Sequence, residues 1–189
     1  MEHLLRVAGV LCLCVAGAGL VESHLFQSFQ SSAFDRERAA RTAIAPLQGD
    51  EHLGFGTPAT GVLGRIEIPR LGIRAMIEEG VDDETLKVAV GHIPGTSRPG
   101  EAGNIGLAAH RDTFFRGLRR IHTGDLLTLT TLDGSRTYRV ASTSVVDPDR
   151  VDVLAAATGV RAVTLVTCFP FHWVGAAPRR FVVRAVAAR

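Results

Sequence analysis

The hairpin sequence LLTLTTLDGSRTYRVASTSVV, residues 126–146, decides the fold class because it favours β-strands over helices. Two runs rich in Thr, Leu and Val, residues 126–132 and 135–146, flank the dipeptide Asp133-Gly134. Asp-Gly is a strong signal for a two-residue hairpin, because both residues tolerate the left-handed backbone that such a turn needs. The stretch therefore predicts two neighbouring antiparallel strands.

Short runs of the same kind continue on both sides of this hairpin. Further strands are expected at residues 65–68, 73–77, 104–109, 160–167 and 181–187. Brief helices are expected near residues 82–90, 114–121 and 151–157. Many short strands with small helices in their connections are typical of a closed sheet. We therefore predict a mostly-β barrel with a few short helices.

The N-terminal region has a different composition. Residues 7–21 form an unbroken apolar stretch preceded by Arg6, which predicts a membrane anchor or signal segment over residues 1–21. The positive charge before the stretch favours export of everything after it, with a single membrane pass if the segment is not cleaved. We expect residues 22–61 to form a stalk or linker and residues 62–189 to form the catalytic domain.

Within the stalk, three kinds of local structure are expected. Residues 27–32 (QSFQSS) are polar and predict a flexible segment. Asp35 is a plausible N-cap for a short exposed helix that runs to Ala45. Prolines and glycines then punctuate residues 46–61, which predicts a loop-rich approach to the domain. No residue proposed for chemistry lies in this region, so a chain beginning at Val62 is expected to fold and to react at close to the full-length rate.

Composition and charge narrow the function classes. Hydrophobic residues make up 46% of the 189 positions and charged residues 21%, which suits a folded domain. The formal net charge is only +2, and the basic residues are scattered along the sequence. A nucleic-acid binder usually gathers basic residues on one face. We therefore predict no nucleic-acid partner.

The three cysteines are unevenly distributed. Cys12 and Cys14 lie in the apolar stretch, which leaves Cys168 alone in residues 62–189. A lone thiol in an exported domain is vulnerable to oxidation, so a chemical role is favoured. The segment Thr164–Cys168 (TLVTC) places this thiol at the end of a buried strand, where a side chain is both rigid and accessible. The alternative is a small hydrophobic residue that ends a core strand.

His110 is the histidine best placed to act with Cys168. It ends the apolar run 104–109, so it has the same position relative to its strand as the cysteine. The other six histidines lie in the N-terminal region, in loops or beside turns. An imidazolium near a thiol favours the thiolate and supplies the proton that a leaving amine needs. A histidine that merely caps a strand is the alternative.

Two adjacent arginines, Arg179 and Arg180, precede the run 181–187. A guanidinium beside a thiol stabilises the negative oxygen of a tetrahedral intermediate, although a solvated rim is the plainer interpretation. Strand alternation puts Arg179 on the same face as Phe181 and Val183. Alternation alone therefore does not settle which arginine faces the thiol.

Together these motifs resemble those of the sortase family. The segment Thr164–Cys168, followed by an arginine and a strand, is similar to the sortase signature, and residues 108–111 (AAHR) resemble the histidine motif. The extension at 112–118 (DTFFRGL) is most like class D. The resemblance runs from about Gly61 to the C-terminus. Ala109 departs from it, because the family usually has glycine before the histidine.

The resemblance implies a fold, a location and a reaction. The fold would be an eight-stranded sortase barrel on the extracytoplasmic side of the cell membrane, working without a cofactor or a metal. The substrate would be a secreted protein with a C-terminal sorting signal of the Leu-Pro-x-Thr-Gly type. Cleavage after its threonine would give a thioacyl enzyme, which an amine from a peptidoglycan precursor or a pilin lysine would resolve. The stalk has no Asp-Pro-aromatic lid, which implies an open site.

The resemblance also assigns roles to four residues. Cys168 would be the nucleophile, and His110 would protonate the leaving amine and deprotonate the incoming one. Arg180, rather than Arg179, would stabilise the oxyanion. Thr167 would help to shape the substrate-binding pocket.

Three other interpretations remain open on the sequence. Zinc held by Cys168, His172, His92 and His110 is one, although the spacing of these residues is not a recognised one. An L,D-transpeptidase would be expected to carry a Ser-His-Gly-Cys run, which is not present around Cys168. A non-catalytic anchored β-domain is the third. The acidic loop of Asp147, Asp149 and Asp152 is interpreted as solvated rather than as a calcium site.

Overall fold

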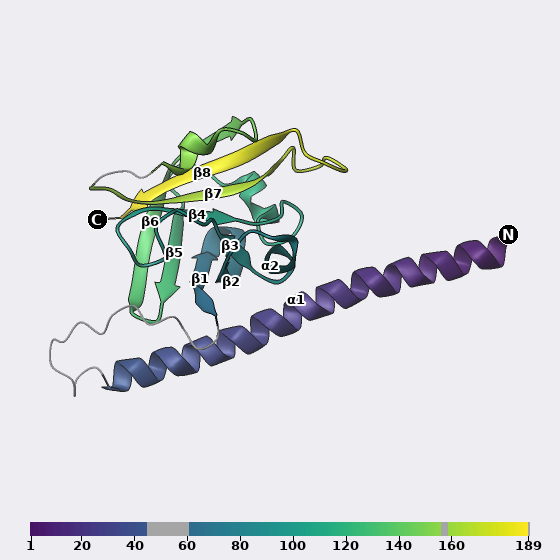
Figure 1. Cartoon of the computed structure of the whole chain (residues 1–189), viewed down its shortest axis with the longest axis horizontal. Helices are drawn as coiled ribbons and strands as arrows, with labels where there is room; N and C mark the ends of the chain where they lie inside the picture. Colours follow the sequence, from purple (N-terminus) through teal and green to yellow (C-terminus); the bar gives the residue numbers. More distant parts are fainter. Residues whose placement is uncertain (45–60, 156–158, 189) are drawn as a thin grey trace.

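The computed structural model describes residues 1–44, 61–155 and 159–188 (Figure 1). Eight strands close into a barrel in the order β1-β2-β3-β4-β7-β8-β6-β5. Their bounds are β1 Val62–Ile68, β2 Ile73–Glu79, β3 Val90–His92, β4 Gly103–Ala108, β5 Leu126–Thr131, β6 Gly134–Val146, β7 Arg161–Phe169 and β8 Arg179–Ala187. The prediction of a mostly-β barrel with small helices is confirmed.

The helices, apart from one, are short pieces in the connections between strands. They are α1 Glu2–Ile44 and α2 Asp83–Val88, together with the 3₁₀ turns η2 Pro69–Leu71, η3 Arg116–Arg120 and η4 Val151–Leu154. The expected helix near 82–90 is α2, which Asp82 caps by accepting hydrogen bonds from the backbone N–H groups of Glu84 and Thr85. It ends earlier than predicted, because Val90 begins β3. The predicted helix at 151–157 is only the turn η4, and residues 156–158 lie outside the described part.

The hairpin of β5 and β6 forms as its sequence predicts. Thr131 pairs with Gly134 at its closed end, and the ladder continues to Leu126 and Arg139. Gly134 has a φ of 155°, in the region that favours glycine. The inward-facing residues of this hairpin and of the other strands form one buried core, which includes Leu127, Tyr138, Ile66, Ile105 and Leu165.

β4 and β7 are the strands that organise one end of the barrel. They run parallel, with Gly103 opposite Arg161 and Ala108 opposite Val166. β7 and β8 run antiparallel, with Cys168 opposite Arg180. The carboxyl ends of β4 and β7 and the start of β8 therefore meet at one end of the barrel.

The helix α1 differs most from the sequence expectations. It is one continuous helix of 43 residues, and its C-terminal half lies along the barrel while its N-terminal half extends beyond it (Figure 1). The expected flexible segment at 27–32 and the expected N-cap at Asp35 are both wrong, since these residues lie inside α1. The loop-rich stretch expected at 46–61 falls almost entirely outside the described residues.

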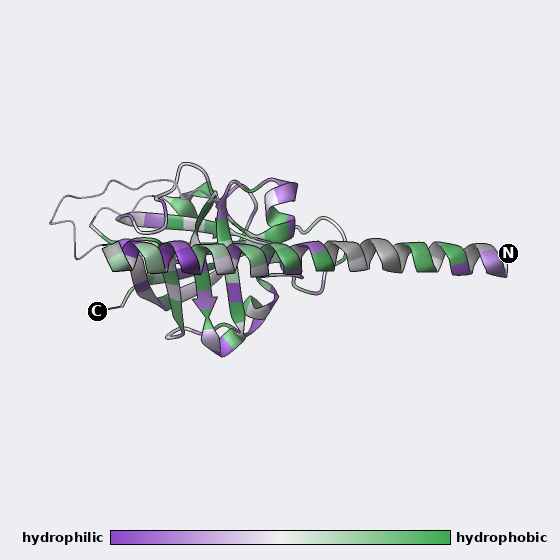
Figure 2. Cartoon of the chain, turned by 90° about the horizontal axis from the view of Figure 1, so that it is seen from below, coloured by the Kyte–Doolittle hydropathy of each residue, from purple (hydrophilic) through white to green (hydrophobic). Residues whose placement is uncertain are grey.

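The contact between α1 and the barrel has an apolar centre. Phe34 is 1% exposed and packs with Val62, Met76 and Leu132 in a small cluster separate from the main core. Figure 2 shows α1 crossing the barrel with hydrophobic and hydrophilic residues interleaved along it. The polar composition of residues 27–32 predicted a flexible segment, although these residues lie in the docked helix. A single buried aromatic residue, Phe34, produces no repeating apolar pattern that a sequence could reveal.

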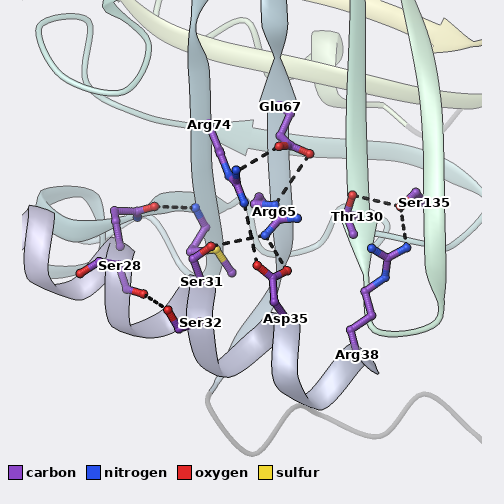
Figure 3. A network of polar contacts seen from close by, with 12 residues as sticks. Ser28, Ser31, Ser32, Asp35, Arg38, Arg65, Glu67, Arg74, Thr130 and Ser135 are labelled. Atoms are coloured by element: carbon purple, nitrogen blue, oxygen red, sulfur yellow. Dashed lines mark hydrogen bonds and ion pairs between the residues drawn. The ribbon is translucent and has the colours of Figure 1, made fainter. Parts of the chain in front are cut away.

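Polar contacts surround this apolar centre (Figure 3). Arg65 of β1 is 7% exposed, and its guanidinium lies 2.9 Å from the carboxylate of Asp35. The same guanidinium lies 5.7 Å from the centre of the Phe34 ring, within cation–π range. Further along α1, the Arg38 guanidinium donates to Ser135 Oγ at 3.2 Å. Helix and barrel are thus joined by specific side chains.

The segment expected to anchor the chain lies in the N-terminal half of α1. Val7, Val10 and Leu11 are each more than 60% exposed there. Among the helices of the described residues, none combines the length and apolarity that crossing a bilayer requires.

Candidate active site

The strand register brings His110 and Cys168 to equivalent positions. Ala108 of β4 is opposite Val166 of the parallel strand β7, and each candidate residue follows its strand partner by two positions. The Ala109 N–H donates to the Val166 carbonyl at 3.3 Å, so the ladder continues past the end of β4. Neighbouring strands lie about 4.8 Å apart. The imidazole and the thiol therefore come from adjacent chain positions at the same end of the barrel, although 58 residues separate them in sequence.

Arg180 shares a face of the sheet with Cys168. The two residues are directly opposite across the antiparallel pair β7–β8, and such side chains project to the same side. Arg179 is opposite Phe169 instead, and alternates with Arg180. Arg179 does share a face of β8 with Phe181 and Val183, as strand alternation predicts. The register shows that Cys168 lies on the opposite face of the sheet, the face of Arg180.

Each of these three side chains is accessible but partly enclosed. Cys168 is a free thiol of intermediate exposure, and His110 and Arg180 fall in the same class. The Arg180 guanidinium donates to the carbonyls of Ala177 and Arg179 at 3.2 and 3.1 Å, which holds it close to the start of β8. A thiol, an imidazole and a cation on one surface can together perform nucleophilic chemistry on an acyl group.

Thr167 holds the backbone beside His110. Its side chain is 2% exposed, and its hydroxyl donates a 2.7 Å hydrogen bond to the carbonyl of Ala109. This buried bond joins the residue before the cysteine to the residue before the histidine. Thr167 therefore fixes the spacing of β4 and β7 at the point where the two reactive side chains emerge.

Arg111 makes a connection that sequence reasoning missed. Its guanidinium donates to the carbonyls of Trp173 and Gly175, at 2.6 and 3.1 Å. Both acceptors lie in the loop from β7 to β8, so the residue after His110 secures the loop after Cys168. The only available signal was its place next to the histidine, because backbone acceptors leave no trace in a sequence pattern.

The remaining histidines have other surroundings. His92 is 2% exposed, and its ring nitrogens lie within 3.0 Å of Glu79, Thr96 and the Ser97 carbonyl. These contacts indicate a structural role in the core.

His122 lies beside the ion pair of Arg70 and Asp125. The hydrogen bond from Arg70 is the main reason why the pKa of the Asp125 carboxyl lies below its ordinary value of 3.8. His172 is exposed in the β7–β8 loop, His3 and His24 are exposed on α1, and His52 lies outside the described residues.

The zinc interpretation finds no support in the geometry. Within residues 1–44, 61–155 and 159–188, no three His, Cys, Asp or Glu side chains come together in a way that could hold a metal ion. His92 in particular is committed to the partners described above. In the acidic loop, the Asp152 carboxylate pairs with Arg150 through two hydrogen bonds of 2.7 and 2.9 Å.

Fold and site together define a closed eight-stranded barrel with a thiol, an imidazole and a guanidinium at one end. The chain belongs to the sortase family, because a sequence model of that family, described as the Sortase domain, matches residues 66–188. The resemblance drawn from the TLVTC and AAHR motifs is thereby confirmed, and the relatives below support its class D character.

Two curated sortases are similar in sequence. The chain is 37% identical over 127 residues to Sortase D of Bacillus subtilis, which covers 67% of this chain and 64% of that protein. It is 32% identical over 153 residues to Sortase SrtE1 of Streptomyces coelicolor, which covers 69% of this chain and 44% of that protein. The chain thus spans less than two thirds of the length of either relative.

Solved sortase structures share the fold. A Clostridium perfringens Sortase D5 transpeptidase superimposes with a TM-score of 0.61 at 29% identity, over 68% of this chain and 79% of that chain. Sortase C-1 from Actinomyces oris superimposes with a TM-score of 0.66 at 26% identity, over 84% of this chain and 99% of that chain.

Proposed function

We propose that this chain is a cysteine transpeptidase that cleaves a sorting motif of the Leu-Pro-x-Thr-Gly type and transfers the acyl group to an amine. The observation that carries the proposal is the register at one end of the barrel. Cys168 is opposite Arg180 across β7–β8, and His110 occupies the matching position on β4. Membership of the sortase family supports the same chemistry.

In the first half of the reaction, the Cys168 thiolate attacks the carbonyl carbon of the motif threonine. The C–N bond to the next residue breaks, and the His110 imidazolium gives its proton to the departing amine. The Arg180 guanidinium stabilises the negative charge that develops on the carbonyl oxygen. The product is a thioester between Cys168 and the substrate threonine.

In the second half, an acceptor amine attacks the thioester carbonyl. The neutral imidazole of His110 takes a proton from the attacking nitrogen, the C–S bond breaks, and the Cys168 thiolate is regenerated. Thr167 contributes by shaping the pocket, a role supported by its buried hydrogen bond to Ala109, which fixes the backbone beside His110. No cofactor or metal takes part in this scheme.

The proposed partners and location follow from this reaction. The substrates are secreted proteins with a C-terminal sorting signal, and the acceptor is an amine of a peptidoglycan precursor or a pilin lysine. Residues 1–21 anchor the chain in the cytoplasmic membrane, and residues 62–189 form the extracytoplasmic catalytic domain. The exposed apolar side chains of Val7, Val10 and Leu11 support the anchor.

The test is cleavage of a Leu-Pro-x-Thr-Gly peptide by the wild-type chain and by Cys168→Ala. Wild type should release the C-terminal fragment and accumulate a thioacyl adduct on Cys168, detected by mass spectrometry. Cys168→Ala should do neither while keeping its circular dichroism spectrum. Retained cleavage in this variant would exclude Cys168 as nucleophile, and inactive but folded wild type would favour the non-catalytic β-domain.

A further inference from the structure

A concave surface opens between α1 and the barrel, with His110 in its lining. It is a cavity of about 890 Å³ between α1, η2, α2 and the segment from His110 to Arg120. Leu71, Ile73 and Phe114 supply its apolar lining. Cys168 does not line it. His110 therefore belongs both to the candidate active site and to the lining of this groove.

The walls of the groove carry an excess of positive charge. The lining includes five basic side chains and two acidic ones, which are Arg74, Lys87, Arg116, Arg119, Arg120, Glu22 and Asp112. Arg74 is engaged by Glu67 at 3.5 Å. In the described part of the chain, the other four basic residues form no ion pair, and all four are exposed. Their charge is thus available to a ligand.

The arginines project from a rigid turn rather than a loose loop. A Cβ placed on Gly117 would lie 3.2 Å from the Ile73 side chain and 3.3 Å from the Leu71 carbonyl, so η3 packs tightly against η2 and β2. Arg70 reinforces this packing, because its guanidinium bonds to the Arg120 carbonyl and to the Asp125 carboxylate. A concave surface lined mainly by charges of one sign focuses the electrostatic field and raises the local concentration of oppositely charged molecules.

The helix α1 forms the opposite wall and is held there by Gln27. The Gln27 side-chain amide donates to the Val88 carbonyl at 2.6 Å, and its oxygen accepts from the Met76 N–H at 2.9 Å. Glu22, Ser23 and His24 line the groove on the same stretch of helix. The docked helix α1 therefore closes one side of the groove.

We propose that this groove binds the amine-bearing acceptor, and that the acceptor it favours carries anionic groups, either phosphate or carboxylate. The proposal rests on the transpeptidase function proposed above. The acceptor nitrogen must reach both the thioester and the His110 imidazole, and His110 is one of the residues that line the groove. A basic groove raises the local concentration of anionic molecules, so the charge selects among amines that are equally nucleophilic.

The experiment compares three acceptor peptides with the same N-terminal amine, Gly-Gly-Gly. After the glycines, the first peptide carries two serines, the second two aspartates and the third two phosphoserines. All three end in a C-terminal amide, so only the side-chain charge differs. The full-length chain in neutral detergent is first acylated with a Leu-Pro-x-Thr-Gly peptide, and the acceptor KM is then measured. We expect the two anionic acceptors to show at least about 10-fold lower KM than the neutral one. The aspartate and phosphoserine arms distinguish carboxylate from phosphate as the preferred group.

Two triple variants sharpen the test. Arg116→Gln/Arg119→Gln/Arg120→Gln should bring the three KM values together, while the thioacyl adduct still forms. Arg36→Gln/Arg136→Gln/Arg139→Gln removes the same charge outside the groove and should keep the preference. Salt at 0.5 M should weaken the preference in wild type, because it screens exposed charges. Equal KM values in wild type, or an equal loss in both triple variants, would overturn the proposal.

A binding measurement separates this proposal from the proposed function. Fluorescence anisotropy of the labelled peptides with Cys168→Ala needs no turnover, so anionic binding there supports the groove even if wild type cleaves nothing. No binding of the anionic peptides, alongside normal cleavage by wild type, would overturn the groove alone. A membrane role is tested with phosphatidylglycerol vesicles: if the groove variant loses vesicle binding but keeps its acceptor preference, the arginines serve the lipid surface and the proposal fails.

Discussion

The side of the barrel that α1 covers and the end that carries Cys168 use polar residues in opposite ways. Under α1, Arg65 is 7% exposed and has its charge matched by Asp35 at 2.9 Å. At the end of the barrel that carries the candidate site, Cys168, His110 and Arg180 are all partly exposed. Within the described residues, neither the thiol nor the imidazole forms a side-chain hydrogen bond. The first region is arranged for stability, and the second leaves its reactive atoms open to a substrate.

The largest effect on stability is expected at Phe34. Phe34→Ala should lower the free energy of unfolding by about 3–5 kcal/mol, because it empties the cluster with Val62, Met76 and Leu132. Phe29 on the same helix is 68% exposed, so Phe29→Ala is the matched control and should change little. Urea denaturation measures both. Similar losses in the two variants would mean that α1 is not docked as described.

In the candidate active site, substitutions should change the rate of peptide cleavage rather than the stability of the fold. His110→Ala should slow peptide cleavage by roughly 10²-fold or more, since it removes the proton donor to the leaving amine. His92→Ala should instead lower stability, because His92 is 2% exposed and bonded on both ring nitrogens. Rate and urea midpoint measured on both variants would separate the two regions, and a purely structural loss at His110 would contradict the assignment.

The adjacent arginines give a sharper version of the same test. Arg180→Ala should slow cleavage by roughly 10²-fold, a typical cost of losing one oxyanion donor. Arg179→Ala should have a far smaller effect, because Arg179 is opposite Phe169 on the other face of the sheet. Initial rates with saturating peptide decide between them. A reversed order would show that the wrong arginine has been assigned.

A smaller effect is expected at the ion pair under α1. Asp35→Ala should cost about 1–2 kcal/mol, because it leaves the mostly buried Arg65 guanidinium with only the longer 3.7 Å ion pair to Glu67. The cost is below that of a fully buried pair because the Asp35 side chain is 47% exposed. Asp35→Asn retains a hydrogen-bond acceptor and should cost less. Equal stability of wild type and Asp35→Ala in urea would show that the pair contributes nothing.

The smallest effect concerns the pH dependence at Asp125. Its pKa is lowered from 3.8, mainly by the hydrogen bond from Arg70, so the folded state favours the ionised carboxylate. This contribution to stability is complete above the unfolded pKa and is lost as the pH falls through the lower folded value. The urea midpoints of wild type and Asp125→Asn should therefore converge between about pH 5 and pH 2. A difference that is constant over this range would contradict the linkage.

The residues of the candidate site could be predicted from the sequence better than the docking of α1 on the barrel. Cys168 and His110 each end an apolar run, and the parallel register of β4 and β7 then brings them together. The resemblance favoured Arg180 over Arg179, but strand alternation alone could not decide between them, because the choice depends on which residue of β7 faces each arginine. Docking of α1 was missed because it depends on isolated contacts from Phe34, Asp35 and Gln27, which form no repeating pattern.

The continuity of α1 gives the molecule a strut of fixed length. From Glu2 to Glu22, the first α1 residue that lines the groove, the helix rises roughly 30 Å at about 1.5 Å per residue. If the first 21 residues lie in the membrane as proposed, the groove opens at the lipid surface rather than far above it. Each residue added to α1 before Glu22 would lift the barrel by about 1.5 Å and turn it by roughly 100° about the helix axis. The number of residues in α1 thus sets both the distance of the site from the membrane surface and its orientation about the helix axis.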